Sequence, residues 1–481
     1  MTRGLVAAAA LALCVSPLSG QDSVAARADY AAAAARLGAY ITHEMKDKDL
    51  SAVSIVLVDK DSTVWARGFG HANPRDSVPA TARTIYRVGS VSKLFTDIAL
   101  MRLVERGALD LDAPIRRYLP EFKVRDDDVA QRATLRHLVT HTGGWLGDCF
   151  SDTGKGDDAL ARYVSAMAEL EQLTPLGEIW HYSNSSFAVL GRLIEVVTGK
   201  TYEAAVRELL FIPLGMAKSC FSADDAITHR VAAGHVIVDE QPRVARPWAF
   251  PRATTPVGGV VSSVRELLRY ARFHLGDGRT QDGGRLLSVG SLELMRTRLA
   301  PADNDRGVGV AWFLREIGGV TIQYHGGAAI GQQGILMLAP ERGFAIAVQT
   351  NSGRGGLLHG EVTKWALKTF VGVDDPEPAH VRMAKSRRDE LVARYTAALA
   401  DVELRAGGDG VLLLRSISHN LLGVKPAPTD PPPAPVAFIG EDRFVCLEGP
   451  MKDVRGEVLR DSTGSVRWIR AGGRVYRRLE T

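Results

Sequence analysis

Strand patterns at both ends of a long region of helical patterns constrain the fold of this chain most. Near the N-terminus, residues 52–70 (AVSIVLVDKDSTVWARGFG) contain two β-rich runs around a polar turn at Asp59–Ser62, which is typical of a hairpin. Two further hairpins are predicted at 309–327 and 334–352, with turns at Gly318–Gly319 and Pro340–Gly343. We therefore expect one antiparallel sheet that is assembled from both ends of this region.

The segments between these hairpins are mostly helical. From residue 90 to about residue 275, apolar side chains recur at helical spacing, and loops rich in Gly and Pro separate the segments. Helices are predicted over Ser90–Arg106, with Gly107 as a natural end, within Ala26–His43 and at 360–372. The predicted fold class is α+β, an antiparallel sheet flanked by helices with an inserted helical subdomain.

The chain after about residue 375 has a different pattern. The stretch DDPEPAH, around Pro376, is typical of a linker. Short strand patterns and one Pro-rich loop (KPAPTDPPPAPV) follow it. We predict one large domain over residues 21–375, and a linker with a small C-terminal β domain over residues 376–481.

The first 20 residues have the layout of a secretory signal peptide. One Arg precedes an apolar run at Leu5–Val15, and Pro17 and small residues follow it. The run is too short to span a bilayer comfortably, and no later stretch is long and apolar enough to do so. We expect a signal peptide at 1–20 and a secreted or periplasmic protein. The bulky Leu13 disfavours lipid attachment at Cys14.

Three cysteines remain once the predicted signal is removed. An odd number in an exported protein leaves at least one thiol free or in an intermolecular bond. A bridge between Cys149 and Cys220 is one alternative, and Cys446 completes the set. The formal net charge of +4 over 481 residues gives no indication of nucleic-acid binding.

No cysteine or histidine cluster predicts a metal site. His137 and His141 have the four-residue spacing of a zinc helix, but Leu138 stands where a general-base glutamate is needed. We predict instead that they belong to a structural helix end capped by Gly143-Gly144.

Ser90 and Lys93 stand three residues apart at the start of a predicted helix, so their side chains share one face. A lysine amine can accept the serine proton, or hold another base ready, when burial or nearby cations lower its pKa. Taken alone, the pair favours an ordinary helix start with a solvated lysine, because serine is a common helix starter and lysine a common solvated residue.

A second motif, Tyr182-Ser183-Asn184, precedes an apolar helix predicted from about Ser186. A phenol flanked by cations can act as a general base, and an asparagine amide can both donate and accept hydrogen bonds. The same residues also suit a turn and a helix cap.

A third motif, His325-Gly326-Gly327, ends a predicted strand. Glycines there allow a substrate to approach the backbone closely. His325 can supply a polar contact, and the N–H of Ala328 can face a developing oxyanion.

In this order and at these separations, the three motifs resemble those of the serine β-lactamase and penicillin-binding-protein superfamily. The resemblance is to its class C-like branch, which also contains D-amino-acid peptidases, DD-carboxypeptidases and esterases. Weaker similarity in segments such as LRHLVTHTGG extends it from about Asp29 to Gly372. It implies a β-lactamase/transpeptidase-like fold and covalent acyl transfer without a cofactor.

The resemblance also implies a role for each matching residue. Ser90 corresponds to the acylated nucleophile, Lys93 to the residue that tunes it, and Tyr182 to the base for acylation and deacylation. Asn184 corresponds to a contact with a substrate amide. The backbone N–H groups of Ser90 and Ala328 correspond to the oxyanion hole.

The third motif departs from the pattern of the β-lactamases. His325 and Gly326 stand where those enzymes have the Lys and Thr of Lys-Thr-Gly, and Gly327 matches the Gly. Histidine is largely neutral near pH 7 and glycine has no hydroxyl, so a carboxylate is held less well. H-x-G occurs among the family's peptidases and esterases, which favours peptide or ester substrates.

We therefore expect a secreted serine hydrolase that acts through an acyl-Ser90 intermediate on an amide or ester, with β-lactams and D-amino-acid peptides as further candidates. The alternative is a penicillin-binding sensor or wall-peptide-binding protein with slow or no turnover. The expected partner is a small-molecule or peptide substrate, cell-wall association is left open, and no nucleic acid or metal is expected.

Two groups of large side chains remain. Trp145, Trp180 and Trp312 can line a cleft, although core packing is the commoner fate of tryptophan. The arginines of 468–478 (WIRAGGRVYRR) are predicted to lie on solvated strand faces, with an anionic wall polymer or membrane surface as the alternative contact.

Overall fold

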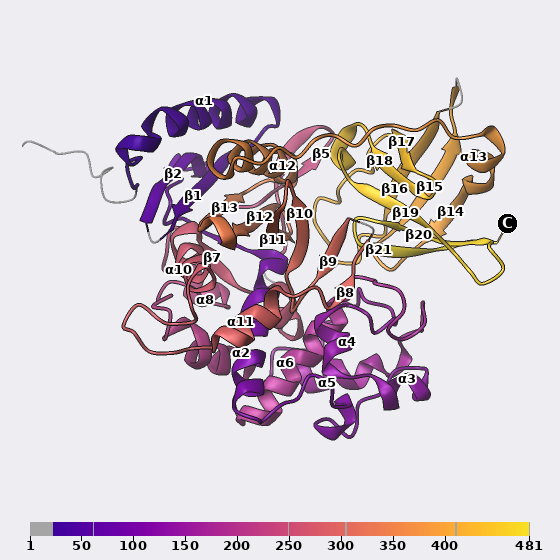
Figure 1. Ribbon diagram of the computed structural model, residues 1–481, viewed down its shortest axis with the longest axis horizontal. Helices are drawn as coiled ribbons and strands as arrows, with labels where there is room; N and C mark the ends of the chain where they lie inside the picture. Colours follow the sequence, from indigo (N-terminus) through magenta and orange to yellow (C-terminus); the bar gives the residue numbers. More distant parts are fainter. Residues whose placement is uncertain (1–22, 61, 249, 304, 409–410, 481) are drawn as a thin grey trace, which may run out of the picture.

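The computed structural model describes residues 23–480 except 61, 249, 304, 409 and 410. A nine-stranded antiparallel sheet, helices on both of its faces and a closed eight-stranded barrel make up the molecule (Figure 1). The predicted signal peptide at 1–20, including Cys14, lies outside the described residues. The α+β fold class and the small C-terminal β unit are confirmed.

The central sheet joins strands from both ends of the predicted large domain, residues 21–375. Its order is β3-β2-β1-β13-β12-β11-β10-β9-β8. β1 pairs antiparallel with β13, with Val53 opposite Thr350, so the N-terminal hairpin and the later strands form one sheet as predicted. The strand bounds are β1 Ala52–Asp59, β2 Ser62–Asn73, β3 Val78–Pro79, β8 Ala300–Pro301, β9 Arg306–Val308, β10 Phe313–Ile317, β11 Val320–Ala329, β12 Gln332–Ala339 and β13 Phe344–Thr350.

Both faces of this sheet are covered, which explains the nearly continuous apolar sequence of β1. Alternate side chains point to opposite faces of a strand. Val53 and Ile55 belong to a core cluster with α1 (Ala31–Asp47) and α12 (Gly355–Ala366). Val56 and Val58 belong to the larger core on the other side, which contains α2 (Ser92–Glu105) and α10 (Val264–Leu275).

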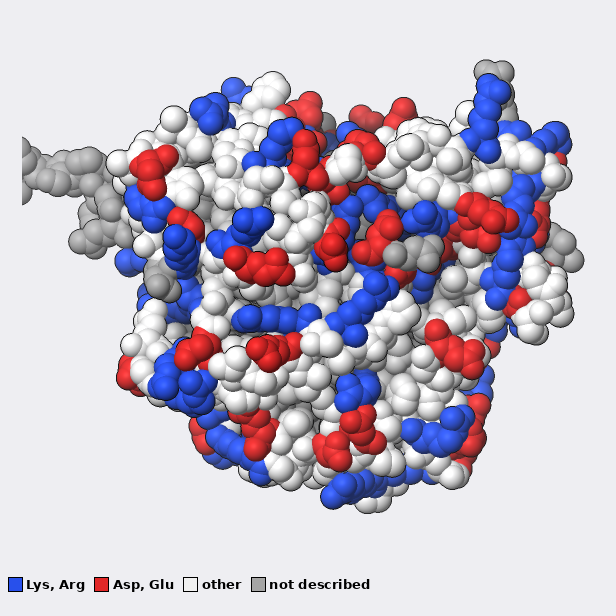
Figure 2. Space-filling view, viewed as in Figure 1, with Lys and Arg blue, Asp and Glu red and all other residues white. Residues whose placement is uncertain are grey.

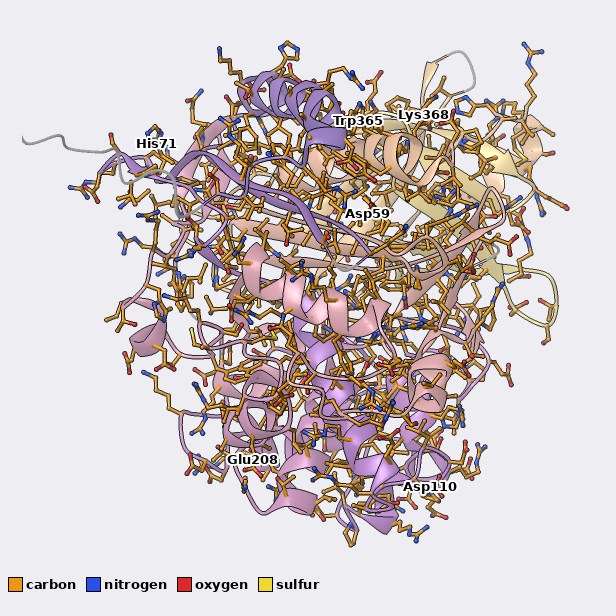
Figure 3. All side chains as sticks on the ribbon, turned by 60° about the vertical axis from the view of Figure 1, so that its left-hand side comes forward. Asp59, His71, Asp110, Glu208, Trp365 and Lys368 are labelled. Carbon is orange, nitrogen blue, oxygen red and sulfur yellow. The ribbon has the colours of Figure 1, made fainter. Side chains whose placement is uncertain are left out.

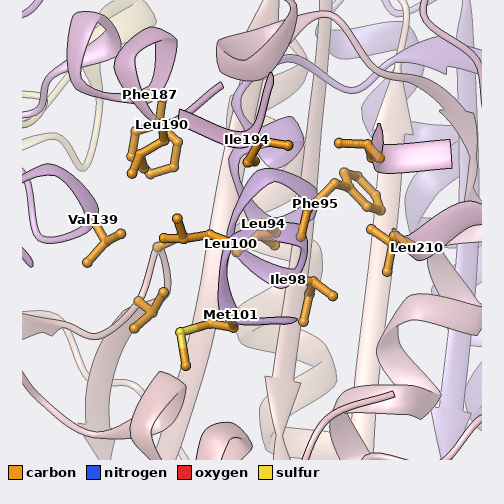
Figure 4. Packing of buried hydrophobic residues seen from close by; sticks show 14 of the residues in the cluster. Leu94, Phe95, Ile98, Leu100, Met101, Val139, Phe187, Leu190, Ile194 and Leu210 are labelled. Atoms are coloured by element: carbon orange, nitrogen blue, oxygen red, sulfur yellow. The ribbon is translucent and has the colours of Figure 1, made fainter. Parts of the chain in front are cut away.

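The helical subdomain surrounds α2, which is buried on nearly all sides. Leu94, Ile98 and Met101 of α2 contact side chains from several other helices (Figure 4). Figure 3 shows Asp110 and Glu208 at this end of the molecule, opposite Trp365 and Lys368. The other helices are α3 Asp127–Arg132, α4 Leu135–Val139, α5 Ala159–Ala166, α6 Asn184–Thr198, α7 Tyr202–Val206, α8 Ala223–Ala226, α9 Thr255–Gly258 and α11 Val289–Arg296. The two small sheets pair β4 (Ile85–Arg87) with β7 (Val261–Ser263), and β5 (His235–Val238) with β6 (Gln241–Val244).

The C-terminal strands close into a barrel, in which every strand pairs on both sides. Closure removes the unpaired edges that expose a sheet to association. Side chains such as Phe438 and Phe444 fill the interior, and α13 (Lys385–Leu391) precedes the first strand. The strands are β14 Ala393–Thr396, β15 Ala400–Ala406, β16 Leu412–Ser418, β17 Ala434–Gly440, β18 Arg443–Cys446, β19 Arg455–Arg460, β20 Val466–Ala471 and β21 Arg474–Arg478. The predicted domain boundary at residue 376 stays a prediction.

Helix boundaries differ from the predicted ones where side chains cap them. The helix predicted from about Ser186 begins at Asn184, because the Ser183 hydroxyl accepts a hydrogen bond from the Ser186 N–H across 3.2 Å. The helix predicted from Ser90 begins as a single 3₁₀ turn, η3 (Gly89–Val91), and continues as α2 from Ser92.

Two other expectations are corrected. The described cysteines Cys149, Cys220 and Cys446 are all free thiols, so the bridge considered between the first two is absent. The helix carrying His137 ends at Val139, and His141 lies beyond it in the left-handed region at φ 58°. The turn there is made by His141 rather than by a cap at Gly143-Gly144, since Thr140 ends the helix.

The surface of the visible face carries Lys and Arg interspersed with Asp and Glu (Figure 2). Among the helices that the structure describes, none combines the length and apolar character needed to cross a bilayer.

Candidate active site

Ser90 lies in the 3₁₀ turn η3, between strand β4 and helix α2, and directly against the end of β11. Two glycines allow this contact. A Cβ atom on Gly327 would lie 1.9 Å from the carbonyl oxygen of Val88, and one on Gly89 would lie 2.6 Å from the N of Ala328. No side chain fits in either place, so the first and third motifs meet through their glycines.

The same approach brings the predicted oxyanion-hole groups together. The Cβ position of Gly327 is 3.0 Å from the N of Ser90, and that of Gly89 is 2.6 Å from the N of Ala328. The backbone N–H groups of η3 and of the end of β11 therefore border one small space. Convergent N–H donors of this kind are suited to a developing oxyanion.

Lys93 is buried below Ser90, with three polar neighbours. Its Nζ lies 2.7 Å from Asn184 Oδ1, 3.0 Å from the carbonyl oxygen of Val257 and 3.3 Å from Ser90 Oγ. Burial, followed by the charge of Arg474, holds the pKa of the Lys93 amine well below its ordinary value. A neutral amine donates its two protons to the closer two oxygens and presents its lone pair to the Ser90 hydroxyl.

Tyr182 is buried beside this pair. Its ring lies 4.9 Å from Lys93 Nζ and stacks on His141 at 4.5 Å between centroids. Its hydroxyl makes no hydrogen bond of standard geometry to a described residue. Burial raises the pKa of the Tyr182 phenol, although the Arg474 cation and the nearby Ser90 hydroxyl act in the opposite sense. The phenol is therefore a neutral proton donor at rest.

Asn184, the first residue of α6, uses both ends of its amide within the protein. Its oxygen accepts from Lys93 across 2.7 Å, and its Nδ2 donates to Asp148 Oδ1. The second N–H of Nδ2 and the second lone pair of Oδ1 remain for the predicted contact with a substrate amide.

His325 is buried at the centre of β11, facing the same space. Its Nδ1 lies 2.6 Å from the carbonyl oxygen of Gly326, so this nitrogen carries the proton and donates. Its Nε2 is then an acceptor with no partner among the described residues. Burial, followed by the charge of Lys93, lowers the pKa of His325 to about 3, so the ring is neutral.

A cavity of about 870 Å³ opens at Ser90 and is lined by every predicted site residue except Lys93. It extends from Ser90 to residues of both the sheet and the barrel. Its far part is bordered by apolar side chains of both, including Ile335, Met337, Leu422 and Val424. The cavity therefore has room for much more than the group that contacts Ser90.

Of the three tryptophans, Trp180 alone lines this cavity. Trp145 and Trp312 are fully buried in the large core instead. The Nε1 of Trp145 donates to Ser185 Oγ across 3.1 Å, which is the core role that large aromatics usually take.

The barrel contributes residues to the site that the sequence analysis missed. The N–H of Tyr182 donates to the carbonyl of Gly473 across 3.0 Å. Arg474 lies 4.6 Å over the Tyr182 ring and pairs with Asp148, with Nε 3.1 Å from Oδ2. Burial opposes its charge, but Asp148 outweighs burial and raises the pKa of the Arg474 guanidinium.

The prediction that residues 468–478 present solvated arginines is therefore wrong at two positions. Arg474 faces the site, and Arg470 is buried, paired with Glu457 and donating to the carbonyl of Trp180 across 2.8 Å. A strand pattern cannot distinguish these arginines from exposed ones, because the Trp180 carbonyl that Arg470 contacts and the Asp148 carboxylate that Arg474 contacts lie far away in the sequence. The one indication in the sequence that this turn contacts another part of the chain was the pair Gly472-Gly473, which stands between the two arginines.

These parts define a class of protein. A helix-flanked antiparallel sheet, an inserted helical subdomain and a Ser-x-x-Lys turn set against a sheet strand are the architecture of the serine β-lactamases and penicillin-binding proteins.

A sequence model of the family described as Beta-lactamase matches residues 37–365, and the chain belongs to that family of serine hydrolases. Penicillin-binding protein 4 of Amycolatopsis lactamdurans is 36% identical over 329 residues, covering 67% of this chain and 86% of that protein. Esterase EstB of Burkholderia gladioli is 34% identical, covering 40% of this chain and 53% of the esterase. The crystal structure of SurE with D-Leu has a TM-score of 0.69 at 25% identity, covering 93% of this chain and all 100% of SurE.

Proposed function

We propose that this protein is an acyl hydrolase in which Ser90 is acylated by an ester or amide substrate. The observation that carries the proposal is the environment of Lys93. This amine is fully buried, its pKa is depressed, and its Nζ is 3.3 Å from Ser90 Oγ. A neutral amine at that position can accept the serine proton as the oxygen attacks a carbonyl.

The other groups then have distinct tasks. Lys93 accepts the Ser90 proton, and the N–H groups of Ser90 and Ala328 stabilise the oxyanion of the tetrahedral intermediate. The Tyr182 phenol, neutral at rest, passes a proton to the leaving group and recovers one from the water that attacks the acyl-enzyme. Lys93 returns its proton to Ser90 Oγ when the acyl group departs. The raised pKa of Tyr182 favours Lys93 over Tyr182 as the first proton acceptor.

The substrate we propose is an ester or amide with a sizeable apolar portion. His325 is neutral and offers an acceptor nitrogen, which suits a donor group better than a carboxylate. The cavity continues from Ser90 along apolar side chains of the sheet and the barrel. An esterase and a penicillin-binding protein among the relatives support esters and peptides as the two substrate classes to compare. We also propose that the segment 1–20 directs export.

The proposal is tested by labelling and turnover. The mature protein is incubated with a fluorophosphonate or a fluorescent penicillin, and the adduct is located by mass spectrometry. We expect a single adduct on Ser90, lost in Ser90→Ala and retained in Ser92→Ala, since Ser92 Oγ is engaged by the N–H of Val260 at 3.0 Å. Folded protein with no adduct from either probe contradicts the proposal.

A hydrolysis panel then separates enzyme from sensor. It compares p-nitrophenyl esters, D-amino-acid amides, D-Ala-D-Ala peptides and nitrocefin. Continuing turnover supports a hydrolase. One equivalent of product without a steady state supports the alternative, a penicillin-binding or wall-peptide-binding sensor.

A further inference from the structure

A chain of polar contacts links Lys93 to the C-terminal barrel. Lys93 Nζ is 2.7 Å from Asn184 Oδ1, and Asn184 Nδ2 donates to Asp148 Oδ1. On its other side, Asp148 receives Arg474, with Nε 3.1 Å from Oδ2 and Nη2 3.5 Å from Oδ1. Asp148 thus touches one residue of the predicted site and one residue of the barrel.

Asp148 lies near the Tyr182 ring, which the Lys93 amine and the Arg474 guanidinium both approach. Lys93 Nζ is 4.9 Å and the Arg474 guanidinium 4.6 Å from the centroid of the Tyr182 ring. Asp148 is only 4% exposed, so little water screens these charges. Without a carboxylate here, an ammonium at Lys93 and a guanidinium at Arg474 repel each other in a desolvated space.

We propose that Asp148 is a positioning residue with two effects on the same base. It holds the Asn184 amide with its oxygen toward Lys93, and it neutralises the barrel cation Arg474 beside the site. This inference rests on the proposed function, in which Lys93 accepts the Ser90 proton. It adds that the barrel, through Arg474, is part of the electrostatics of that step.

Of the carboxylates near Lys93, Asp148 has the larger effect on the pKa of the Lys93 amine. Asp97, one turn further along α2, is fully buried, and burial raises its pKa well above the ordinary value, while Lys93 acts in the opposite sense. Burial lowers the pKa of His141 and His325, so both rings are neutral as well. Among the described residues, three charged groups act on the pKa of Lys93, in decreasing order Arg474, Asp148 and Asp97, so the effect of Asp148 exceeds that of Asp97.

Asp148 and Arg474 shift the pKa of Lys93 in opposite directions, so their removal should have opposite effects on the pH dependence of activity. Asp148 raises the pKa of Lys93 and Arg474 lowers it. The acid limb of kcat/KM reports the base that must be deprotonated in the free enzyme. With a p-nitrophenyl ester, we expect Asp148→Asn to move this limb to lower pH and Arg474→Gln to move it to higher pH, each by about one unit. The double variant, which removes both charges, should return it to near the wild-type position.

A second ion pair between the barrel and the catalytic part provides the matched control. Arg477, also on β21, pairs with Glu171. Arg477→Gln and Glu171→Gln each remove one interdomain charge without facing Lys93. We expect both to leave the acid limb in place. Asp148→Ala, which also removes the acceptor for Asn184, should lower kcat more than Asp148→Asn does, at equal folded fraction by circular dichroism.

The outcomes separate this inference from the proposed function. Opposite shifts that cancel in the double variant support it. Shifts in the same direction, or no shift in folded variants, overturn it while Ser90 labelling stands. If either single variant fails to fold, the double variant is the deciding measurement. An acid limb of kcat/KM that lies more than about half a pH unit from that of the wild type shows that the two effects do not cancel and contradicts the inference. Failure of the wild type to label at Ser90 overturns the proposed function itself.

Discussion

The backbone N–H of Tyr182 donates to the carbonyl oxygen of Gly473 across 3.0 Å, so main chain of the C-terminal barrel holds a tyrosine of the predicted site. Two residues further along, the N–H of Val475 donates to His181 Nδ1, also at 3.0 Å. The hairpin turn between β20 and β21 is therefore docked against the segment that precedes α6. Changes in this turn should reach the site through the backbone.

Gly473→Ala should lower both stability and activity. Gly473 has φ 82°, and a Cβ atom there would lie 2.9 Å from the Trp180 ring. The left-handed conformation costs a non-glycine residue about 1–2 kcal/mol, and the contact pushes Trp180 and its neighbour Tyr182. We expect kcat/KM to fall at least ~10-fold, measured with a p-nitrophenyl ester, since small displacements of catalytic groups are costly.

Gly464→Ala is the matched control, because Gly464 lies in another barrel turn at φ 84° with no atom within 4 Å of the new Cβ. It should lose similar stability in urea denaturation and keep its kcat/KM. Equal activity losses in the two variants would show that barrel stability alone, and not the contact at Trp180, controls the site.

Tyr182→Phe should lower kcat by about 10²-fold or more, as expected when a positioned proton donor and acceptor is removed. The hydroxyl makes no standard hydrogen bond to a described residue, so its removal leaves no stranded partner. Thermal unfolding should therefore change little. Steady-state kinetics and a melting curve measure the two effects separately, and unchanged turnover would remove Tyr182 from the mechanism.

The free energy of unfolding should fall as the pH drops below about 6.5, in part through His359. This side chain is buried behind the sheet in α12, and burial lowers its pKa to about 3. Below pH 6.5, His359 binds a proton in the unfolded chain but stays unprotonated in the native state until the pH approaches about 3. Each such histidine contributes a loss of at most about 1.4 kcal/mol per pH unit, until the pH approaches the native pKa.

His359→Gln should therefore reduce the loss of stability between pH 7 and pH 5 in urea denaturation. His43→Gln changes a side chain that is 79% exposed on α1 and should leave that loss as in the wild type. A pH dependence that is identical in all three proteins would contradict the assignment to His359.

Gly360→Leu should discriminate between substrates by length. Gly360 of α12 lines the far part of the cavity, and a Cβ atom there meets nothing within 4 Å. A leucine should occupy this space and lower kcat/KM for a dodecanoyl ester by about 10-fold, while the acetyl ester is unaffected, since the lost apolar burial concerns only the long chain.

Gly290→Leu, at an exposed position of α11 outside the cavity, is the control for the same change within a helix. Both esters should be hydrolysed by it as by the wild type. If Gly360→Leu affects neither ester, the far part of the cavity does not hold the acyl chain.

Several features of the fold could be predicted from local patterns. The alternating and continuous apolar runs of β1 and β13 predicted strands, and the order of strands and helices predicted one antiparallel sheet with an inserted helical subdomain. The glycines of the third motif predicted a close approach to backbone, which the structure shows between Gly327 and Val88. These predictions hold because periodicity and glycine geometry act over a few residues.

Predictions from the same patterns failed where a partner lies far away in the chain. Arg470 and Arg474 have the alternation of exposed strand residues, yet Arg470 is buried and donates to the Trp180 carbonyl, and the half-buried Arg474 pairs with Asp148. His141 is four residues from His137, as on a helix, but it lies beyond the helix end and its ring stacks on that of Tyr182. Spacing along a strand or helix specifies a face, and it does not specify what that face will meet.

By itself, then, the sequence determined the elements, their order, the family and the three motifs that meet around Ser90. The pKa shifts of the residues around Ser90 were decided by the tertiary structure alone. Burial lowers the pKa of Lys93 and of His325 and raises that of Tyr182. Arg474 lowers the pKa of both Lys93 and Tyr182, and Asp148 acts in the opposite sense on both. Burial and charge pairing depend on residues hundreds of positions apart, and a pKa is a property of that three-dimensional surrounding rather than of the residue type.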